Sequence, residues 1–242
     1  MKCAVIGGTG LIGSQVVKLL NADGHEAVPH SQSTGVDVIS GQGLDEAVAG
    51  ADVVVNLTNS PTFDEASPAF FQTSMDNLLA AARKGGAGHF VILSIVGVDQ
   101  VPELDYYRAK ALQEDILAAG PVPYSIVRAT QFMEFMDAVL SWTADGDTVR
   151  LPATPIQPIA SKDVAGAVAE VAAGTPLNSI YSIGGPEVFP LDELGRITLS
   201  HKGDNRTVVT DPTAGMFAAV KGDVLTDMDA HLAPTRYADW LS

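Results

Sequence analysis

Apolar segments of strand length alternate with amphipathic segments of helix length through the first half of the chain. A period near two, or a short apolar run, predicts a strand, and a period near 3.6 predicts a helix. The predicted strands are residues 3–6, 26–29, 36–39, 52–57, 90–95 and 124–127, and the predicted helices are residues 11–22, 44–49, 68–84 and 105–119. This alternation with short connections predicts an α/β fold of Rossmann type, a doubly wound parallel sheet with right-handed crossovers.

The third of these helices has clear signals at both of its ends. Ser67 is expected to be its N-cap, Pro68 lies in its first turn, and Gly85-Gly86 ends it. The segments 52–57 and 90–95 are rich in Val, Ile and Leu. Such runs are typical of central parallel strands that are covered on both faces.

The alternation loosens after Arg128. A helix is predicted over 131–142, an extended segment at 148–151, a helix over 163–173 and an extended segment at 180–183. No linker rich in Ser, Gly or Pro interrupts the chain, so residues 1–242 are expected to form a single domain. Within it, about 131–160 and 178–242 are expected to form a small C-terminal lobe on the substrate side.

Composition narrows the classes of partner. The chain has 242 residues and a formal net charge of −15, which argues against binding to nucleic acid or to an anionic membrane, because both need a basic face. No apolar run is long enough for a membrane span, and no cleavage site for a secretory signal follows the N-terminus. The single cysteine, Cys3, fits a reducing cytoplasm. We expect a cytoplasmic protein whose partner is a small molecule.

A glycine-rich turn joins the first predicted strand to the first predicted helix. In Gly7-Gly8-Thr9-Gly10-Leu11-Ile12-Gly13, a G-x-x-G-x-x-G register from Gly7 overlaps a G-x-G-x-x-G register from Gly8. Glycines occupy such a turn in dinucleotide-binding folds because side chains would block the pyrophosphate and keep the helix from the strand. A tight turn without a ligand is the alternative, but the strand before it and the helix after it favour dinucleotide binding. The expected cofactor contacts are Gly7, Thr9, Gly10, Leu11, Ile12 and Gly13.

The residues after the second predicted strand bear on the choice of cofactor. An acidic residue about 20 positions past the glycines selects NAD, because it binds the ribose 2′-hydroxyl. The segment His30-Ser31-Gln32-Ser33-Thr34 contains no acid and offers hydrogen-bond donors to a 2′-phosphate. The sequence therefore predicts NADP(H) in preference to NAD(H), with contacts from His30, Ser31, Gln32 and Ser33. For Asp37, a contact with the adenine amino group and a cap on its own turn are both open.

A tyrosine and a lysine stand four residues apart on the helix predicted over 105–119. Tyr106 and Lys110 share one helical face, and an ammonium near a phenol lowers the pKa of the phenol. Such a phenol can pass a proton to a developing alkoxide. Ser94 ends the preceding strand, at the edge of the sheet where ligands bind in open α/β folds, and can orient a carbonyl. A solvated helix face is the alternative for the pair.

Four segments together resemble the short-chain dehydrogenase/reductase superfamily. They are the glycine turn, Leu93-Ser94-Ile95, Tyr106 to Lys110, and the stretch from Val127 to Phe132. The chain is most similar to the extended or atypical branch, the NAD(P)H-binding, NmrA-like proteins. The resemblance covers nearly the whole chain and is weakest after about residue 178.

The resemblance implies roles for individual residues. The superfamily's catalytic Ser, Tyr and Lys match Ser94, Tyr106 and Lys110, and Lys110 would also hold the nicotinamide ribose. The loop matching Thr58 and Asn59 lies beside the cofactor ribose in the family. The chain departs from many NADPH-binding relatives, which carry an arginine in the neighbourhood of Gln32. Some atypical relatives lack the Tyr–Lys pair and only sense the cofactor.

Further residues have two interpretations each. Arg128 follows an apolar run and is expected to contact a cofactor phosphate or substrate oxygen, or else to pair with a structural acid such as Glu134. A cluster of large apolar residues follows it and either lines a substrate pocket or belongs to the core. These residues are Phe132, Met133, Phe135 and Met136. The five histidines show no ligand spacing, so no metal site is predicted.

The leading hypothesis is an NADPH-dependent oxidoreductase that reduces a small apolar carbonyl or quinone at a Ser/Tyr/Lys site. The alternative from a different class is a non-catalytic regulator that senses NADP and binds a protein partner. A nucleotide-sugar epimerase or dehydratase is the third hypothesis, and the short C-terminal part leaves little room for its substrate.

Overall fold

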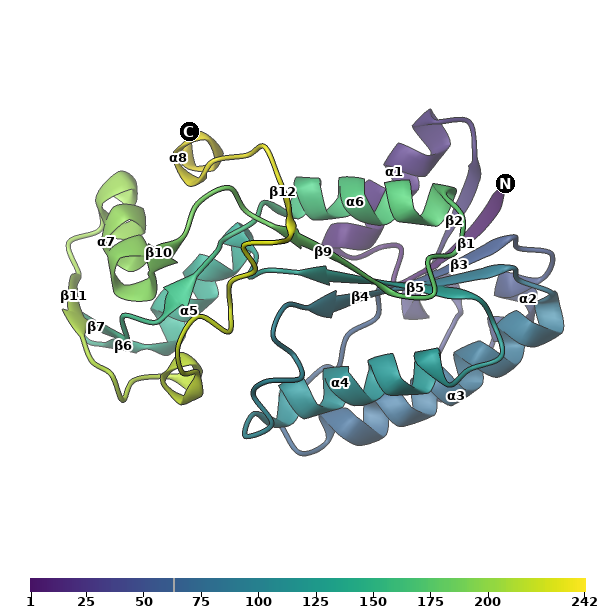
Figure 1. The fold of residues 1–242 in the computed structure, drawn as a ribbon, viewed down its shortest axis with the longest axis horizontal. Coiled ribbons are helices and arrows are strands. Elements are labelled where there is room, and N and C mark those ends of the chain that lie inside the picture. Colours follow the sequence, from purple (N-terminus) through teal and green to yellow (C-terminus); the bar gives the residue numbers. More distant parts are fainter. Residues whose placement is uncertain (63) are drawn as a thin grey trace. The chain divides into compact units, whose positions relative to one another are not determined.

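The main structural feature is a seven-stranded parallel sheet, seen in a computed structural model that describes residues 1–62 and 64–242 (Figure 1). Its strands are β1 (Lys2–Ile6), β2 (Glu26–His30), β3 (Val53–Asn56), β4 (His89–Ile95), β5 (Tyr124–Ala129), β9 (Ile180–Gly184) and β12 (His231–Leu232). Their spatial order is β12-β9-β5-β4-β3-β1-β2. The predicted α/β fold with a doubly wound parallel sheet is confirmed.

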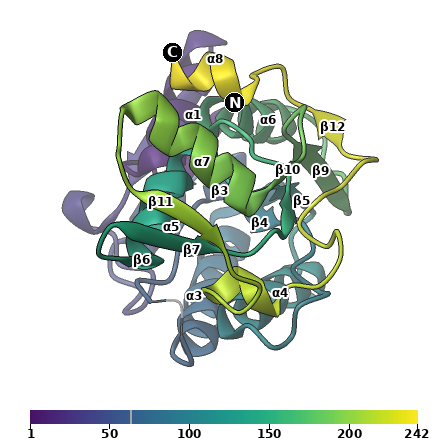
Figure 2. The same ribbon diagram turned by 90° about the vertical axis from the view of Figure 1, so that its left-hand side faces the viewer.

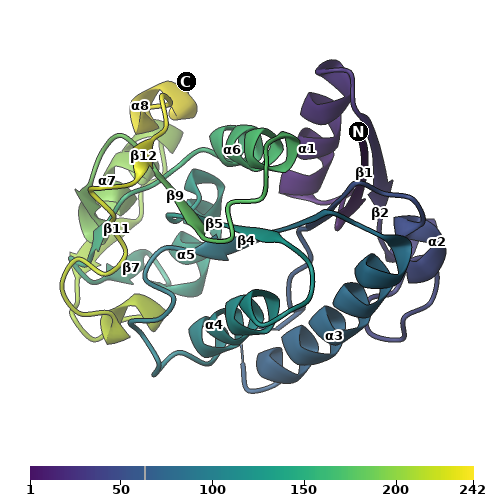
Figure 3. The ribbon, with the colours of Figure 1, turned by 45° about the vertical axis from the view of Figure 1, so that its right-hand side comes forward.

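Helices cover both faces of this sheet. They are α1 (Leu11–Ala22), α2 (Leu44–Val48), α3 (Ser67–Gly85), α4 (Asp105–Ala118) and α6 (Ser161–Ala173). Figures 1 and 3 show α1 and α6 on one face, and α3 and α4 on the other. The strands are apolar on both faces for this reason: all four residues of β3 and the first four of β4 are buried.

The chain forms two compact units. Unit 1 consists of residues 1–94, 105–128 and 164–181, and unit 2 consists of residues 95–104, 129–163 and 182–242. In unit 1 a continuous apolar core contains five fully buried side chains from three elements. They are Ile6 of β1, Phe90 and Ile92 of β4, and Met75 and Leu78 of α3. The predicted substrate-side role of the second unit stays a prediction.

Unit 2 has smaller sheets and shorter helices. Its elements include α5 (Met136–Trp142), β6 (Ala144–Asp145), β7 (Thr148–Leu151), β8 (Pro155–Ile156), β10 (Phe189–Pro190), α7 (Leu191–Lys202), β11 (Thr207–Thr210) and α8 (Tyr237–Leu241), with the 3-10 turns η2 (Met133–Phe135) and η3 (Met216–Ala219). One sheet has the order β11-β7-β6, and β10 pairs with β8 in a second (Figure 2). Helix α7 lies against β7 and β11.

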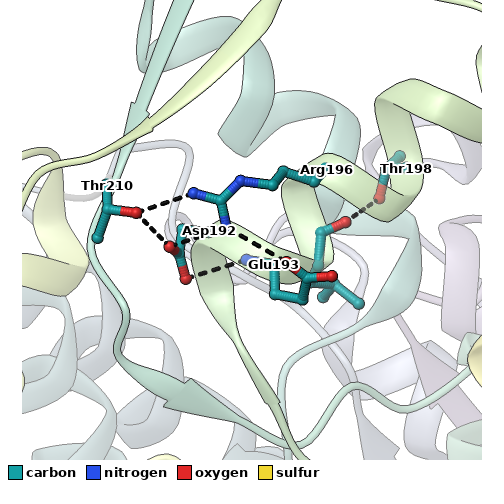
Figure 4. A network of polar contacts seen from close by, with 6 residues as sticks. Asp192, Glu193, Arg196, Thr198 and Thr210 are labelled. Carbon is teal, nitrogen blue, oxygen red and sulfur yellow. Dashed lines mark hydrogen bonds and ion pairs between the residues drawn. The ribbon is translucent and has the colours of Figure 1, made fainter.

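A polar network joins α7 to β11 (Figure 4). Asp192 accepts hydrogen bonds from the Thr210 hydroxyl at 2.5 Å and from the Arg196 guanidinium at 3.0 Å. Arg196 also donates to the Thr210 hydroxyl at 2.8 Å. Burial alone would raise the pKa of Asp192, but the hydrogen bonds from Thr210 and Arg196 lower it. The hydrogen bonds from Thr210 and Arg196 therefore compensate the loss of solvation of the Asp192 carboxylate.

Three local predictions were wrong. Residues 36–39 do not form a strand: Val36 and Val38 are buried in the core, but the chain here makes a turn after the 3-10 segment η1 (Gln32–Thr34). Helix α3 starts at Ser67, whose hydroxyl donates to the Thr62 carbonyl at 2.7 Å instead of capping the helix. The helix predicted over 131–142 is a 3-10 turn followed by the short α5.

Within the described ranges 1–62 and 64–242, no helix has both the length and the apolar character that a bilayer span requires.

A buried histidine at the start of β4 predicts how stability depends on pH. His89 is 3% exposed, its Nε2 lies 2.8 Å from the Ser125 hydroxyl, and burial lowers its pKa below the ordinary 6.5. The unfolded chain therefore binds a proton at a pH where the folded chain does not. The stability is complete above pH 6.5 and falls as the pH drops below it, by at most about 1.4 kcal/mol per pH unit for one proton.

Urea unfolding of the wild type and of His89→Gln, each at pH 7.5 and pH 5.0, measures this effect. We expect the variant to lose less stability on acidification than the wild type. His25→Gln, at a half-buried turn position, is the control and should lose as much as the wild type. Equal losses in all three proteins would contradict the assignment.

Candidate functional site

The glycine-rich turn ties the end of β1 to the end of β2. The Gly7 N–H donates to the His30 carbonyl at 2.8 Å, and the Gly8 N–H donates to the Val5 carbonyl at 3.1 Å. The Gly10 N–H then donates to the Gly7 carbonyl at 3.1 Å. The chain thus reverses within a few residues and enters α1 directly.

Three of the glycines are required by the close packing of the backbone around them, whether or not a ligand binds. A Cβ atom on Gly7 would lie 2.8 Å from the Leu57 carbonyl, and Gly7 has a φ of +79°. A Cβ on Gly8 would lie 2.6 Å from the Val5 carbonyl oxygen, and one on Gly13 would lie 2.2 Å from the Gly7 carbonyl oxygen. Any side chain at these positions would push α1 away from β1 or distort the turn.

Gly10 differs from its neighbours. A Cβ there would meet only the Gly7 carbonyl oxygen, at 3.3 Å, and the φ of −77° suits any residue. Gly10 is exposed and is the N-cap of α1, which has no side-chain cap and no acidic residue in its first turn. The amides that begin α1 are therefore available to an anion, and the helix dipole favours one.

The segment after β2 is polar, exposed for the most part, and uncharged at 31–34. The Ser31 and Ser33 hydroxyls lie 2.8 Å apart, and the Ser31 N–H donates to the Thr34 hydroxyl at 2.8 Å. His30 is half-buried, and burial lowers its pKa. Neutral His30 can still donate one hydrogen bond from its ring.

Of the two interpretations of Asp37, the structure favours the cap on its own turn. One carboxylate oxygen accepts from the Ile39 N–H at 2.9 Å and the other from the Ser40 hydroxyl at 2.9 Å. These two hydrogen bonds hold the pKa of Asp37 below its ordinary value. The carboxylate thus has local partners that account for its position.

The loop after β3 lies against the glycine turn. Ile6 of β1 pairs with Asn56 of β3, and a Cβ on Gly7 would lie 3.0 Å from the Thr58 nitrogen. The buried Asn56 accepts hydrogen bonds from the Thr58 N–H at 3.0 Å and from the Thr58 hydroxyl at 2.7 Å. The structure therefore brings Thr58 next to the glycines, and the place of this loop beside the cofactor ribose stays a prediction.

Tyr106 is held by Asn59. Its hydroxyl donates to the Asn59 side-chain oxygen at 2.7 Å, and burial raises its pKa to about 12. The prediction that Lys110 lowers this pKa was wrong, because the loss of solvation outweighs any effect of the ammonium one turn away. At neutral pH the phenol is protonated, so it can act as an acid.

Lys110 points into the protein. It is 4% exposed, and its ammonium donates to the Leu93 carbonyl at 2.6 Å and to the Gln113 side-chain oxygen at 2.5 Å. It also lies 5.0 Å from the centre of the Phe71 ring. Burial lowers the pKa of Lys110 to about 7. A lysine with such a pKa exchanges protons at neutral pH.

Ser94, next to the Leu93 carbonyl that binds Lys110, keeps an unused hydroxyl. The residue is 3% exposed, and its Oγ has no hydrogen-bond partner in the described part of the chain. A buried hydroxyl without a partner costs free energy and points to a missing partner. The Lys110 ammonium thus binds the carbonyl of the residue that directly precedes Ser94, near the end of β4.

Arg128 forms an ion pair with Glu114. Its Nε lies 3.0 Å from one Glu114 oxygen and its terminal nitrogen 2.6 Å from the other. Glu134 instead accepts from the Ser161 hydroxyl at 2.6 Å. Both partners of the ion pair are largely buried. The structure thus shows a structural pair with a different acid from the one named in the sequence analysis, and the predicted cofactor contact of Arg128 stays a prediction.

Sequence analysis missed Gln113 and Glu114. They follow Lys110 on α4 by three and four residues, a spacing that brings helical side chains together. This spacing from Lys110 is the sequence signal from which both residues could have been predicted. No group of three or more His, Cys, Asp or Glu residues in the described ranges is arranged to hold a metal ion.

Comparison with known families agrees with this geometry. Residues 7–174 match the model of a family described as NAD(P)H-binding. This chain belongs to that NAD(P)H-binding family. The predicted membership of the short-chain dehydrogenase/reductase superfamily is confirmed, and with it the prediction of an oxidoreductase of that type.

Curated relatives of this protein include two reductases and an assembly factor. A (4-alkanoyl-5-oxo-2,5-dihydrofuran-3-yl)methyl phosphate reductase of Streptomyces griseus is 28% identical over 78% of this chain and 70% of its own length. The divinyl chlorophyllide a 8-vinyl-reductase of Cucumis sativus is 27% identical over 78% of this chain, which spans only 54% of that protein. The photosystem II assembly factor Ycf39 of Synechocystis is 24% identical over 88% of this chain and 72% of its own length.

Solved structures share the fold. A Citrobacter triphenylmethane reductase complexed with NADP(H) has a TM-score of 0.69 at 18% identity, over 87% of this chain and 79% of that one. A UDP-N-acetylglucosamine 4-epimerase of Bacillus cereus also has a TM-score of 0.69, at 17% identity over 87% and 85% of the two chains. At such identities the likeness concerns the fold alone.

The ion pair predicts that Arg128 matters for stability. Arg128→Met leaves the Glu114 carboxylate buried without its partner, and we expect the free energy of unfolding to fall by about 3–5 kcal/mol. Urea unfolding measures this loss. The double variant Arg128→Met/Glu114→Leu should regain most of it, because neither charge of the pair is then buried without the other.

Cofactor titration of the same variants separates the two roles of Arg128. The folded Arg128→Met protein should bind NADPH within a few-fold of the wild type. Unchanged stability together with a large loss of NADPH affinity would instead assign Arg128 to the cofactor.

Proposed function

We propose that this protein is an NADPH-dependent reductase of a small, largely apolar carbonyl compound or quinone. The observation that carries the proposal is Gly10, an exposed glycine at the start of an uncapped α1 for which the fold itself has little need. A glycine in that place lets a ligand approach the backbone closely. The reductase names of curated relatives support the reaction class.

The pyrophosphate of the cofactor would bind at the turn from Gly7 to Gly13. The start of α1 has no side-chain cap there, and the exposed Thr9 adds a hydroxyl beside it. Thr58 and Asn59 would lie along the ribose, since the Thr58 backbone adjoins Gly7. With a net charge of −15, the protein would hold this anion by backbone dipoles more than by cations.

The preference for NADPH over NADH rests on the segment after β2. His30, Ser31, Gln32 and Ser33 offer donors to a 2′-phosphate, and no carboxylate among them would repel it. Solved structures with the same fold hold NADP(H) in one case and NAD in others, so the preference rests on the segment after β2 and not on the fold.

Bound NADPH would supply a hydride to the carbonyl carbon, and the protein's own groups would manage the proton. Tyr106, with a pKa of about 12, stays protonated at neutral pH and is still more acidic than an alcohol. It can therefore donate its proton to the alkoxide that forms on the substrate. For this step the Tyr106 hydroxyl must leave its hydrogen bond to Asn59 and form one to the substrate oxygen.

Ser94 and Lys110 would complete the site. The unpartnered Ser94 hydroxyl can donate a hydrogen bond to the substrate oxygen and orient it. Lys110 lies one turn after Tyr106 on α4, and its pKa of about 7 suits the return of a proton to the phenolate. The net change is a carbonyl reduced to an alcohol by one hydride and one proton.

A second candidate is a regulator that binds the dinucleotide without turnover. The similarity to an assembly factor over 88% of this chain favours it. The hydrogen bond that engages the Tyr106 hydroxyl with Asn59 also agrees with it. Turnover with a panel of ketones and quinones separates the two candidates.

Gly10→Ala tests the cofactor site. The added methyl group meets one protein atom, the Gly7 carbonyl oxygen at 3.3 Å, and Ala is a poorer N-cap than Gly, so we expect a small loss of thermal stability without cofactor and at least a tenfold weaker affinity for NADPH. Fluorescence titration with NADPH and with NADH measures the affinity and the preference. Gly166→Ala, at an open position on α6, is the control and should bind as the wild type does. Wild-type affinity in Gly10→Ala would remove the main support for the site.

Tyr106→Phe tests the chemistry. Loss of the acid should lower the turnover number at least about 100-fold while NADPH affinity stays within two-fold. The decrease in absorbance of NADPH on reaction with a ketone or quinone measures turnover. Tyr107→Phe changes the buried neighbouring phenol in the same way and should stay active. Full activity in Tyr106→Phe would refute the assignment, and a wild type that binds NADPH but reduces no compound of the panel would favour the regulator.

A further inference from the structure

Gln113 of α4 is fully buried and directs the oxygen of its side-chain amide at Lys110. The exposed fraction of Gln113 is 0%, and its Oε1 accepts a hydrogen bond from the Lys110 ammonium at 2.5 Å. The Leu93 carbonyl of β4 accepts a second hydrogen bond from the same ammonium at 2.6 Å. One oxygen from a helix and one from a strand therefore fix the position of the amine within unit 1.

The nitrogen end of the Gln113 amide has a weak partner. Its Nε2 lies 3.7 Å from the Met75 sulfur of α3, and the Nδ2 of the buried Asn56 lies 3.4 Å from the same sulfur. A thioether is a weak hydrogen-bond acceptor, so this end of the amide contributes little. The reverse orientation would bring an NH₂ group against the ammonium, which has no acceptor to offer. The main contact of Gln113 is therefore the one with Lys110.

The ionisable neighbours of Lys110 are protonated or already paired. On its own helix, Tyr106 stays protonated at neutral pH, and Glu114 is engaged by the Arg128 guanidinium of β5 at 2.6 Å. The groups that face the ammonium from α3 and β4 are the ring of Phe71 and a backbone carbonyl, neither of which titrates. Burial lowers the pKa of Lys110 to about 7 and outweighs the opposite effect of Glu114.

We propose that Gln113 is a positioning residue whose neutral amide holds the Lys110 amine at the Leu93 carbonyl without the counter-charge that a carboxylate would bring. A glutamate of nearly the same shape could accept the same hydrogen bond, but its charge would stabilise the protonated amine. The amide orients the amine and leaves it able to exchange a proton near pH 7. This inference rests on the proposed function in one respect, that the exchanged proton is the one returned to the Tyr106 phenolate.

Phe71 connects the amine with Tyr106. The centre of its ring lies 5.0 Å from the Lys110 Nζ and 6.4 Å from the centre of the Tyr106 ring. When the ammonium returns a proton to the phenolate, an N–H bond breaks and the phenol O–H bond forms, and the neutral amine then takes up a proton from water. A neutral amine cannot give this proton, so turnover should fall as the pH rises above the pKa of the amine.

NMR titration of the full chain without cofactor, with isotope-labelled lysine, tests the role of Gln113. The Lys110 signal is identified by its absence in Lys110→Met, and in the wild type it should titrate near pH 7. In Gln113→Glu we expect the pKa to rise by at least about one pH unit, because a carboxylate at this distance favours the charged amine. In Gln113→Leu the pKa should fall, because the ammonium loses an acceptor. Gln72→Glu adds the same charge at an exposed position of α3 and should titrate as the wild type does.

The pH profile of turnover shows whether the same amine serves the reaction. In Gln113→Glu the alkaline limb of kcat should move to higher pH by the same amount as the pKa of Lys110. A merely structural role of Gln113 would lower the melting temperature of its variants and would leave both the pKa and the alkaline limb unchanged.

Two results would overturn the inference. One is a wild-type Lys110 that titrates at the ordinary 10.5, a measurement that needs no variant to fold. The other is the same pKa of Lys110 in the wild type and in folded Gln113→Glu and Gln113→Leu. Because the NMR titration needs neither cofactor nor substrate, the expected shifts in a protein that reduces no compound of the panel would retain the role of Gln113 and reject the reductase function.

Discussion

The close approach of α1 to β1 is the constraint on which the rest of the molecule depends. Gly13 lies so near the Gly7 carbonyl oxygen that a Cβ would stand 2.2 Å from it, and the Gly7 N–H is bound to the His30 carbonyl. This contact joins the first helix to the first two strands. It places the uncapped start of α1 just beyond the carboxyl end of β1. Three glycines are required by the packing of this turn, whereas a Cβ on Gly10 would meet only the Gly7 carbonyl oxygen, at 3.3 Å.

Burial, more than charge, sets the chemistry on α4. Tyr106 and Lys110 stand one turn apart, yet their pKa values of about 12 and about 7 each follow from the loss of solvation. Desolvation favours the neutral form of both groups. The result is a pair in which a protonated phenol stands beside an amine that is about half protonated at pH 7. Asn59 and Gln113 position the two side chains, so the site depends on polar neighbours as much as on its reactive groups.

Polar groups inside the protein fall into two kinds. Asp192, Gln157 and Glu114 are buried, and each has named partners that compensate it. Ser94 and Gln131 are polar, and the hydrogen-bonding atoms of both are buried without partners in the described part of the chain. Ser94 lies near the end of β4, and Gln131 follows the end of β5. An unpaired buried polar group costs free energy, so these two side chains destabilise the fold unless water or a ligand pairs with them.

The sequence alone determined the succession of strands and helices, the turn from Gly7 to Gly13 and the family, because these depend on local periodicity and on glycines at fixed spacing. It could not determine partners. That Arg128 pairs with Glu114, that residues 36–39 turn away from the sheet and that burial reverses the expected pKa shift of Tyr106 were decided only by the tertiary structure. Each of these depends on how far a side chain is removed from water and on which distant groups replace that water, and neither quantity is encoded by spacing along the chain.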